Sequence, residues 1–313
     1  MNRAELRQRI QGVIGVTTTP FDSDFEIDYG RMSNLTQWWV DNGLVKGKAL
    51  LKIGSVMGEG PQMREDEWPA LVRTVVQAAN GEVDIIAASH CKDTIRTIED
   101  CKRAEDLGAI GIQIAPPLFN DPNQDDILRF YEAISDAIGI GIMVYQNHWF
   151  PNSGIHTETF NKMANFEHVV AIKWASFDKC PIESMPDLSK KFNLIENGND
   201  RVGFHKMGGR GFLDKTSVAY PPHELEMWES LESGNYDKAQ ALWESVDIPI
   251  QELGKRFHEK SGGQARFKKA LMNAMGHRVG HQRPPTLPVT EQEMEELRTL
   301  LTRIGWPVPK THI

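Results

Sequence analysis

The sequence has few cysteines, no long apolar run and no basic cluster, and each absence excludes a class of protein. Its three cysteines, Cys91, Cys101 and Cys180, are an odd number without metal-type spacing, so they fit a reducing cytosol rather than a disulfide framework. No stretch approaches the roughly 18 apolar residues of a membrane span, and the charged segment Met1–Gln11 has no apolar signal core. We therefore expect a cytoplasmic protein with no membrane partner.

Charge and length narrow the class further. The formal net charge is −8 and there is no long basic run, which argues against a nucleic-acid or anionic-membrane partner. The 313 residues, 40% of them hydrophobic, suffice for one large α/β domain of roughly 250 residues plus an extension.

Eight short apolar segments recur roughly every 25 to 35 residues, with helix-like segments between most of them. The predicted strands are Val13–Thr19, Ala49–Gly54, Val83–Ala88, Ala109–Ala115, Ile140–Tyr145, Val169–Trp174, Phe192–Glu196 and Gly211–Lys215. The amphipathic segments include Glu65–Ala79, Thr94–Leu107 and Asp125–Ala137, with Asp93 and Asn123 placed to cap two of them.

Strand–helix alternation predicts parallel βαβ units, and eight units in about 220 residues favour a closed (β/α)8 TIM barrel over an open doubly wound sheet. The first strand is followed by Thr17-Thr18-Thr19-Pro20, which is not the glycine-rich fingerprint of a dinucleotide site. From about His223 the pattern is helical only, over Leu225–Glu232, Tyr236–Leu253, Ala265–Met275 and Glu291–Arg303, with a proline-rich link at Arg283–Pro288. We expect a barrel over residues 1–222 and, over 223–313, a C-terminal helical extension that packs on it.

Lys173 lies inside the apolar run Val169–Ser176. A central strand of a parallel sheet is covered on both faces, so a lysine there loses water or points into a cavity. Desolvation lowers the pKa of an amine and leaves part of it as a free nucleophile, which is what a Schiff-base lysine needs. The alternative is a lysine that reaches past the strand end to solvent.

Other strand ends carry polar or glycine-rich segments. The second predicted strand runs into Ser55-Val56-Met57-Gly58-Glu59-Gly60, where backbone N–H groups could approach an anion; the alternative is simply a tight turn. Tyr145 ends the fifth strand and could donate and accept a proton, or be a packed ring. Asp214 and Lys215, inside the eighth, suggest a polar pocket wall, or a mutual salt bridge or solvated edge.

Three other residue groups would indicate different chemistry: a metal site, a thiol nucleophile and a carboxylate pair. His277 and His281 have the i, i+4 spacing of metal ligands, but the glycine between them and the nearby prolines argue against a rigid helix, so we expect no metal. A thiol nucleophile with His90 as base would place adjacent residues on opposite faces of a strand. Asp214 with Glu59 could form an acid/base pair, at a distance the sequence does not fix.

The order of these motifs resembles the dihydrodipicolinate synthase / N-acetylneuraminate lyase superfamily of class I aldolases and dehydratases, from about Gly12 to Leu301. The motifs are Lys173 after isoleucine, Tyr145 28 residues before it, the Gly58-Glu59 turn, Thr18-Thr19-Pro20-Phe21-Asp22, Gly198-Asn199-Asp200 and Gly208-Gly209-Arg210-Gly211. The resemblance implies a TIM barrel with a C-terminal helical part, a homo-oligomer that is usually a tetramer, and neither a metal nor an organic cofactor.

The resemblance also implies residue roles. Lys173 matches the lysine that forms an imine with a 2-oxo acid, and Tyr145 matches the tyrosine that moves protons at the reacting bond. The segment Ser55–Glu59 matches the family's Gly-Thr-Thr-Gly-Glu, whose backbone amides hold the substrate carboxylate. Ser55, Val56, Met57 and Gly58 are therefore expected to bind substrate, together with Phe119, Asn147, Trp149 and Asp214.

Departures from the family pattern predict a different substrate. Val56 and Met57 replace two threonines, so Ser55 is the hydroxyl that could relay a proton to Tyr145. Phe119 replaces a second relay tyrosine, and the arginine for a second carboxylate is missing after Tyr145. We therefore do not expect dihydrodipicolinate synthesis. The apolar Trp149-Phe150 pair suggests a site that accepts an aromatic group, closer to the hydratase-aldolases of aromatic degradation.

The sequence thus predicts a lyase that acts on a 2-oxo acid through a lysine imine. We expect a pyruvate-dependent aldolase or hydratase-aldolase that cleaves or forms a C3–C4 bond, with an aldehyde as second substrate. The same imine would also serve a dehydratase of 2-keto-3-deoxy sugar acids. Two further alternatives are a sensor or structural oligomer that binds 2-oxo acids without turnover, and a metal-dependent aldolase on the same fold.

Overall fold

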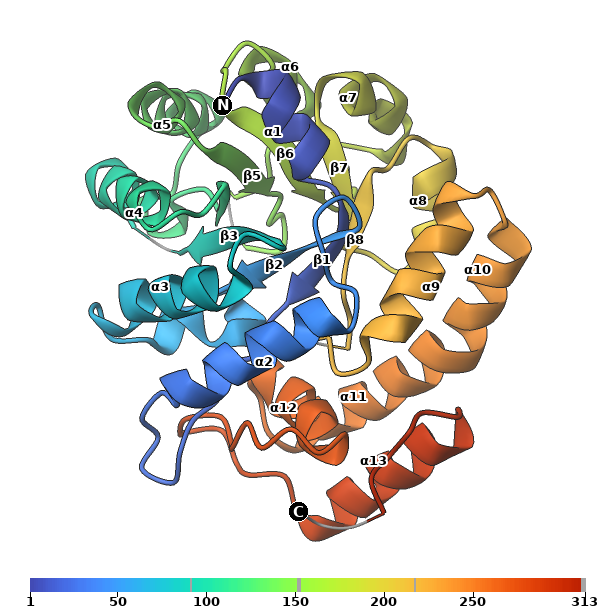
Figure 1. Ribbon diagram of the computed structural model, residues 1–313. Coiled ribbons are helices and arrows are strands. Elements are labelled where there is room, and N and C mark those ends of the chain that lie inside the picture. The colour runs from blue at the N-terminus through green and yellow to red at the C-terminus, as the bar shows by residue number, and fades with distance from the viewer. Residues whose placement is uncertain (91, 151–152, 217, 311–313) are drawn as a thin grey trace. The chain divides into compact units, whose positions relative to one another are not determined.

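Eight parallel strands follow one another around a closed barrel in the computed structural model, which describes residues 1–90, 92–150, 153–216 and 218–310 (Figure 1). The strands are β1 (Gly12–Val16), β2 (Ala49–Ile53), β3 (Asp84–Ser89), β4 (Gly111–Ile114), β5 (Gly141–Tyr145), β6 (Val169–Trp174), β7 (Asn193–Glu196) and β8 (Gly211–Leu213). The predicted TIM barrel and its eight strand segments are confirmed.

Some strands end earlier than their apolar runs predict. β1 ends at Val16 instead of Thr19, and β8 ends at Leu213 instead of Lys215. At this edge the Asp214 side chain accepts hydrogen bonds from the backbone N–H groups of Val16 (3.2 Å) and Thr216 (2.8 Å). The buried Asp214 carboxylate thus accepts hydrogen bonds from backbone N–H groups that would have paired between the strands in a longer sheet. Both strands therefore end here.

Contacts along the chain divide it into two compact units. The barrel unit comprises Met1–Ile14, Val45–Lys52 and Val83–Leu213, and the helical unit comprises Gly15–Leu44, Ile53–Glu82 and Asp214–Ile313, of which residues 217 and 311–313 are not described. The predicted division into a barrel over 1–222 and an extension over 223–313 stays a prediction.

Within its described residues the barrel unit contains the strands, apart from residues 15–16 of β1 and residue 53 of β2, and six α-helices: α1 (Arg3–Arg9), α4 (Thr94–Asp106), α5 (Gln124–Ala137), α6 (Thr157–Met163), α7 (Met185–Lys191) and α8 (Arg201–Lys206). Two 3-10 turns, η3 (Leu118–Asn120) and η4 (Ile182–Ser184), belong to it as well. Both predicted caps are confirmed: Asp93 accepts from the N–H groups of Ile95 (2.9 Å) and Arg96 (3.0 Å), and Asn123 accepts from that of Asp126 (2.9 Å).

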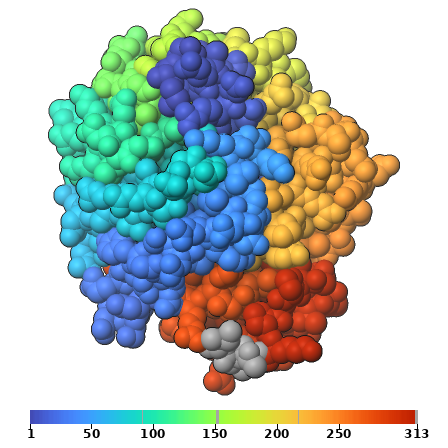
Figure 2. Space-filling view, in the orientation of Figure 1, coloured from blue at the N-terminus to red at the C-terminus, as the bar shows by residue number. Residues whose placement is uncertain are grey.

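Helix α1 contacts β5 and β6 at their amino ends. Arg3 donates to the carbonyl oxygens of Phe166 (2.6 Å) and Val169 (2.5 Å), and Ile10 is fully buried. A Cβ on Gly141, the first residue of β5, would lie 2.4 Å from Ile10 Cδ1, so a larger residue there would require the Ile10 side chain to move. The helix, dark blue in Figure 2, lies on the surface beside the yellow-green segments of the same unit.

The helical unit contains seven α-helices and three short turns. They are α2 (Tyr29–Asp41), η1 (Val56–Gly58), η2 (Gly60–Gln62), α3 (Glu67–Ala79), α9 (Pro221–Glu232), α10 (Tyr236–Leu242), η5 (Trp243–Asp247), α11 (Ile248–Lys260), α12 (Gln264–Ala274) and α13 (Glu291–Arg303). The helix expected over Tyr236–Leu253 is interrupted by the π-turn η5 and continues to Lys260. Pro249 has no amide hydrogen for the carbonyl four residues earlier, and the wider turn accommodates this missing bond.

Two predictions rest on what the sequence lacks, a membrane span and a disulfide framework, and both can be compared with the structure. Over the described ranges, no helix is both long enough and apolar enough to cross a membrane. Cys101 and Cys180 are buried free thiols, and burial raises the pKa of Cys101. Cys91, and with it the pairing of His90 with a thiol, lies outside the described residues.

Candidate active site

Lys173 and Tyr145 are in contact at the carboxyl ends of two neighbouring strands. β5 and β6 pair so that Tyr145 lies opposite Lys173, and directly paired residues place their side chains on the same face of a sheet. The Lys173 Nζ atom is 3.5 Å from the centroid of the Tyr145 ring, and the lysine is only 8% exposed. Lys173 is therefore a buried lysine and does not extend past the strand end into solvent.

The Tyr145 phenol is buried next to an indole. Burial raises the pKa of Tyr145 to about 12, and a hydrogen bond with the Trp149 side chain opposes that increase. The indole N–H is the donor in this bond because Trp has no acceptor. The ring centroids of Tyr145 and Trp149 lie 6.0 Å apart in an edge arrangement. At neutral pH the phenol is therefore protonated, with its oxygen already accepting one hydrogen bond.

The loop after β5 is held by polar contacts that leave one amide oxygen without a partner. Gln146 exchanges two hydrogen bonds with the backbone of Ile155, at 2.9 and 2.8 Å. The Asn147 carbonyl oxygen accepts from the Phe150 N–H (3.3 Å) and from the Ser153 hydroxyl. Asn147 Oδ1 is buried and finds no hydrogen-bond partner among the described residues. Asn147 is thus positioned by its backbone while its side-chain oxygen stays available to a ligand.

The predicted carboxylate-binding segment forms a tight turn in the helical unit. Gly58 and Gly60 both donate their N–H groups to the Ser55 carbonyl, at 2.9 and 3.0 Å. A Cβ on Gly58 would lie 2.8 Å from the Thr17 carbonyl oxygen, and one on Gly60 would lie 1.7 Å from that of Gly54. These glycines are therefore required by close backbone packing. Ser55 Oγ is buried and has no hydrogen-bond partner within the described part of the chain.

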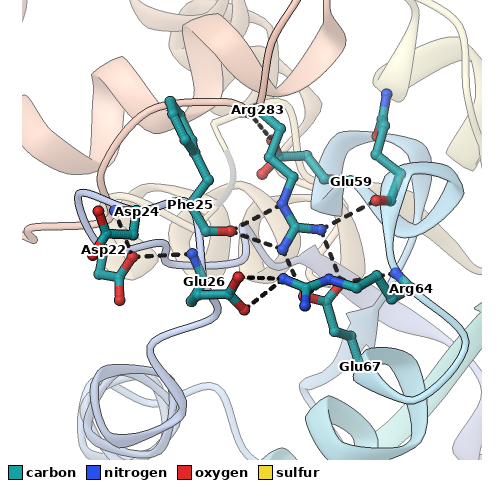
Figure 3. Close-up of polar contacts among 9 residues, drawn as sticks. Asp22, Asp24, Phe25, Glu26, Glu59, Arg64, Glu67 and Arg283 are labelled. Carbon is teal, nitrogen blue, oxygen red and sulfur yellow. Dashed lines mark hydrogen bonds and ion pairs between the residues drawn. The ribbon is translucent and has the colours of Figure 1, made fainter.

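Arg283 fixes the segment that follows this turn, as Figure 3 shows. Its guanidinium donates to the Phe25 carbonyl oxygen (Nη2, 2.8 Å) and to both carboxylate oxygens of Glu67 (2.8 and 2.6 Å). Arg64 extends the network, with an ion pair to Glu26 and a second to Glu67 at 3.3 Å. The hydrogen bond from Arg283 is the main reason that the pKa of Glu67 is lowered. The proline-rich link thus contributes a residue that orders the turn.

Glu59 is the buried partner of Lys269. Its Oε2 atom lies 2.8 Å from Lys269 Nζ, both side chains are almost fully buried, and the ammonium also donates to the His281 carbonyl oxygen at 2.8 Å. Burial raises the pKa of Glu59 and lowers that of Lys269 to about 8, because each charge has lost water. This pair could not be predicted from the sequence, since its members lie 210 residues apart.

Phe119 and Asp214, two further predicted substrate ligands, have very different surroundings. Phe119 lies in η3 after β4 and is 86% exposed. Asp214 is fully buried, and its carboxylate accepts from Val16, from the Thr216 N–H and from the Thr216 hydroxyl (2.9 Å). These contacts give Asp214 a structural role at the ends of β1 and β8. Substrate binding by either residue stays a prediction.

Among the described residues, one group of possible metal ligands lies close together. It is not the pair His277 and His281, which the sequence spacing suggested. Ligand atoms of His223, Glu224 and Asp247 lie within 4.8 Å of one another, all buried in the helical unit. His223 Nε2 is already 2.8 Å from Asp247 Oδ2, and Glu224 Oε1 is 3.2 Å from the Thr216 hydroxyl. His277 instead packs on Trp38 with ring centroids 4.1 Å apart.

Known proteins of similar sequence and structure cover almost the whole chain. A sequence model of the dihydrodipicolinate synthetase family matches residues 9–304. A 4-hydroxy-tetrahydrodipicolinate synthase from a Thermotoga species is 29% identical over 301 residues, which are 94% of this chain and 99% of the relative.

Solved structures show the same fold. A dihydrodipicolinate synthase from Oceanobacillus iheyensis superposes with a TM-score of 0.82 at 22% identity, covering 96% of this chain and 98% of that one. A chloride-inhibited dihydrodipicolinate synthase from Acinetobacter baumannii, complexed with pyruvate, gives 0.81 at 23% identity, covering 95% and 99%. At these identities the structures support the fold alone, whereas the sequence match spans the chain. The chain therefore belongs to the dihydrodipicolinate synthetase family, whose members are Schiff-base lyases.

Proposed function

We propose that this protein is a pyruvate-dependent aldolase or hydratase-aldolase in which Lys173 carries the substrate as an imine. The contact between Lys173 and Tyr145 is the observation that supports this proposal most directly: a buried amine lies 3.5 Å from the ring of a buried phenol at paired strand ends. An amine in such surroundings is suited to nucleophilic addition, and the adjacent phenol is placed to move a proton.

The reaction begins when the neutral Lys173 amine adds to the C2 ketone of a 2-oxo acid and water leaves. Loss of a C3 proton to solvent converts the resulting iminium into an enamine, which is nucleophilic at C3. In the bond-forming direction C3 attacks the aldehyde carbon, and the protonated Tyr145 phenol gives its proton to the aldehyde oxygen. Cleavage runs the same steps in reverse, with Tyr145 as phenolate, whose charge the Trp149 N–H would stabilise. Hydrolysis of the imine then frees the product.

Residues other than Lys173 and Tyr145 select the substrate in this proposal. We keep the hypothesis that Ser55 and the backbone of Val56–Gly58 bind the substrate carboxylate, and that Asn147 Oδ1 accepts a hydrogen bond from the substrate. Trp149 and Phe150 are each 49% exposed, so they present apolar area to an incoming aldehyde. An aromatic aldehyde fits this surface better than a second carboxylate does.

Borohydride trapping with pyruvate tests the imine. We expect an irreversible pyruvyl adduct, seen by intact mass and assigned to Lys173 by peptide mapping. Lys52 is an internal control, because it is another buried lysine of the barrel unit and hydrogen bonds to Gln113 at 2.9 Å. Lys173→Ala should lose the adduct because it has no side-chain amine. Lys173→Arg should lose it because a guanidinium stays charged and cannot form the imine. An adduct on Lys52, or none on the folded wild type, would contradict the proposal.

Turnover assays separate the alternatives. An aldolase releases an aldehyde from a 4-hydroxy-2-oxo acid, whereas a dehydratase yields a product that keeps every carbon atom. A sensor would form the adduct and turn over none of the substrates. Activity that EDTA abolishes would indicate the metal-dependent aldolase instead.

A further inference from the structure

A second pocket lies in the barrel unit at the carboxyl ends of β6 and β7. Its volume is about 390 Å³, within the range of roughly 300–1,000 Å³ that small-molecule sites occupy. Its wall includes Trp149, Trp174, Ile182, Glu196, Phe204 and Met207. The segments around it come from the loop after β5, the ends of β6 and β7, and helix α8.

This pocket faces away from the imine site. Successive side chains on a strand point to opposite faces, so Trp174 and Lys173 lie on opposite faces of β6. β6 and β7 pair with Trp174 opposite Glu196, which places these two side chains on the same face. That face is turned toward α8, because the rings of Trp174 and Phe204 lie 5.8 Å apart. The pocket is thus separate from the Lys173–Tyr145 pair.

Glu196 brings an unexplained carboxylate to this pocket. The residue is 2% exposed, and neither of its carboxylate oxygens has a hydrogen-bond partner among the residues that the structure describes. Its Oε1 atom lies 3.1 Å from where a Cβ on Gly198 would be, and Gly198 lines the pocket as well. Burying a carboxylate without a partner is costly, so such a group calls for an explanation.

The surroundings of Glu196 favour a cation. The described lining residues include the carboxylates Glu196 and Asp200 and no lysine or arginine. The guanidinium of Arg201, the next residue after Asp200, is outside this lining and lies 4.1 Å from the ring of Phe212, the residue that pairs with Glu196 across β7 and β8. Aromatic faces on the wall attract cations as well. Trp174 Nε1 is also buried, with no hydrogen-bond partner in the described part of the chain.

We propose that this pocket binds an organic ammonium ion that carries a flat apolar group. The ammonium donates to the Glu196 carboxylate, and the apolar group packs against the rings of Trp174 and Phe204. Trp149 lines the pocket and also hydrogen bonds to Tyr145. A single side chain therefore connects this pocket with the proposed catalytic phenol. Binding itself does not depend on imine chemistry.

Calorimetric titration of the full chain with benzylammonium chloride tests the proposal, with benzyl alcohol as the neutral probe of similar shape. We expect saturable binding of benzylammonium at one site and binding of benzyl alcohol that is weaker by about tenfold or more, since the charged hydrogen bond is missing. Absence of saturable benzylammonium binding, or equal binding of the two probes, overturns the proposal without any variant.

Three variants locate the site. Glu196→Gln keeps the shape and should weaken benzylammonium binding by about tenfold or more. Asp200→Asn is the matched control: Asp200 is an exposed carboxylate of the same wall that caps α8, asparagine caps equally well, and binding should stay within about twofold. Lys173→Ala should bind the probe like wild type even if it loses all imine chemistry. Unchanged binding in Glu196→Gln, or equal loss in Asp200→Asn, would contradict the assignment.

Discussion

At the scale of single residues, the chemistry depends on a phenol whose proton affinity is set in opposite directions by burial and by one neighbouring side chain. Burial raises the pKa of Tyr145 to about 12, and the hydrogen bond with Trp149 lowers it. A phenol with this pKa is a proton donor throughout the neutral range. The bond-forming direction uses that form directly, whereas cleavage requires the less abundant phenolate.

Tyr145→Phe should therefore slow turnover but leave imine formation intact. Removing a positioned proton-transfer group typically costs about 10²–10⁴-fold in rate. We expect a fall in kcat of that order in an aldehyde-coupled assay, while borohydride trapping on Lys173 continues. A Tyr145→Phe enzyme that turns over at the wild-type rate would assign proton transfer to another group.

Trp149→Phe tests whether the indole N–H supports Tyr145. The variant keeps an aromatic ring but loses the donor, so the phenolate loses a hydrogen bond and the pKa of Tyr145 rises further. We expect lower kcat in the cleavage direction and a rising alkaline limb displaced to higher pH, measured as a pH–rate profile. Phe150→Leu is the control, as it changes the apolar surface alone and should leave the pH profile in place.

Lys173 and Tyr145 could be predicted from sequence because strand register and spacing set their relation: Tyr145 ends β5, and Lys173 is the last residue but one of β6, the strand that pairs with it. The hydrogen bond between Trp149 and Tyr145 could not, because a loop of four residues has many conformations. The role proposed for Glu196 could not be predicted from the sequence either. It reads as the polar end of a buried strand, and only the structure shows that its carboxylate has no partner among the described residues.

At the scale of elements, the Gly58-Glu59 turn combines sequence-local and long-range interactions. Gly60 packs closely on the backbone of nearby Gly54, whereas Gly58 packs on the backbone of Thr17 and Glu59 is paired with Lys269 of α12. Periodicity predicted the helix that carries Lys269 but could not predict that this lysine is buried. The same limit applies to the π-turn before Pro249, where the hydrophobic pattern continues through a change of backbone hydrogen bonding.

Lys269→Met should strongly destabilise the fold. It leaves the Glu59 carboxylate buried without its cation, and breaking one side of a buried pair typically costs about 3–5 kcal/mol of unfolding free energy. Adding Glu59→Gln should recover much of that loss, because no charge then remains buried. Urea unfolding measures both.

The exposed pair Lys238–Glu226 is the matched control for this experiment. Its ion pair has the same 2.8 Å length, but both side chains are about half exposed, so Lys238→Met should change the stability little. Additive effects of the Glu59 and Lys269 substitutions would contradict the coupling.

At the scale of the whole molecule, the family resemblance implies that several copies of this chain assemble. We propose a homo-oligomer, a tetramer by that resemblance, with four times the chain mass of 35.4 kDa. Eight strands and their order followed from periodicity alone because each βα unit repeats the same local pattern. Oligomer size has no such local signal, so it stays a prediction.

Acid stability of the whole chain should depend in part on Glu293. Burial raises its pKa, but hydrogen bonds from Arg266 and Thr290 outweigh that effect, and the pKa falls from 4.5 to about 2. Above about pH 4.5 the carboxylate is charged in both states, and its favourable contacts contribute fully to stability. As the pH falls from about 4.5 toward 2, the unfolded chain takes up the proton first, so this contribution is lost. The difference in pKa corresponds to at most about 3 kcal/mol.

Glu293→Gln removes this titration. We expect the variant to have a lower Tm than wild type at pH 7, and the difference in Tm to shrink as the pH is lowered from 5 toward 2, measured by calorimetry at matched ionic strength. Glu296→Gln is the control on the same helix, because Glu296 is half exposed and pairs with the exposed Arg256. A Tm difference between wild type and Glu293→Gln that stays constant down to pH 2 would show that the loss arises from packing, since a lost charge interaction must disappear once the wild-type carboxylate is protonated.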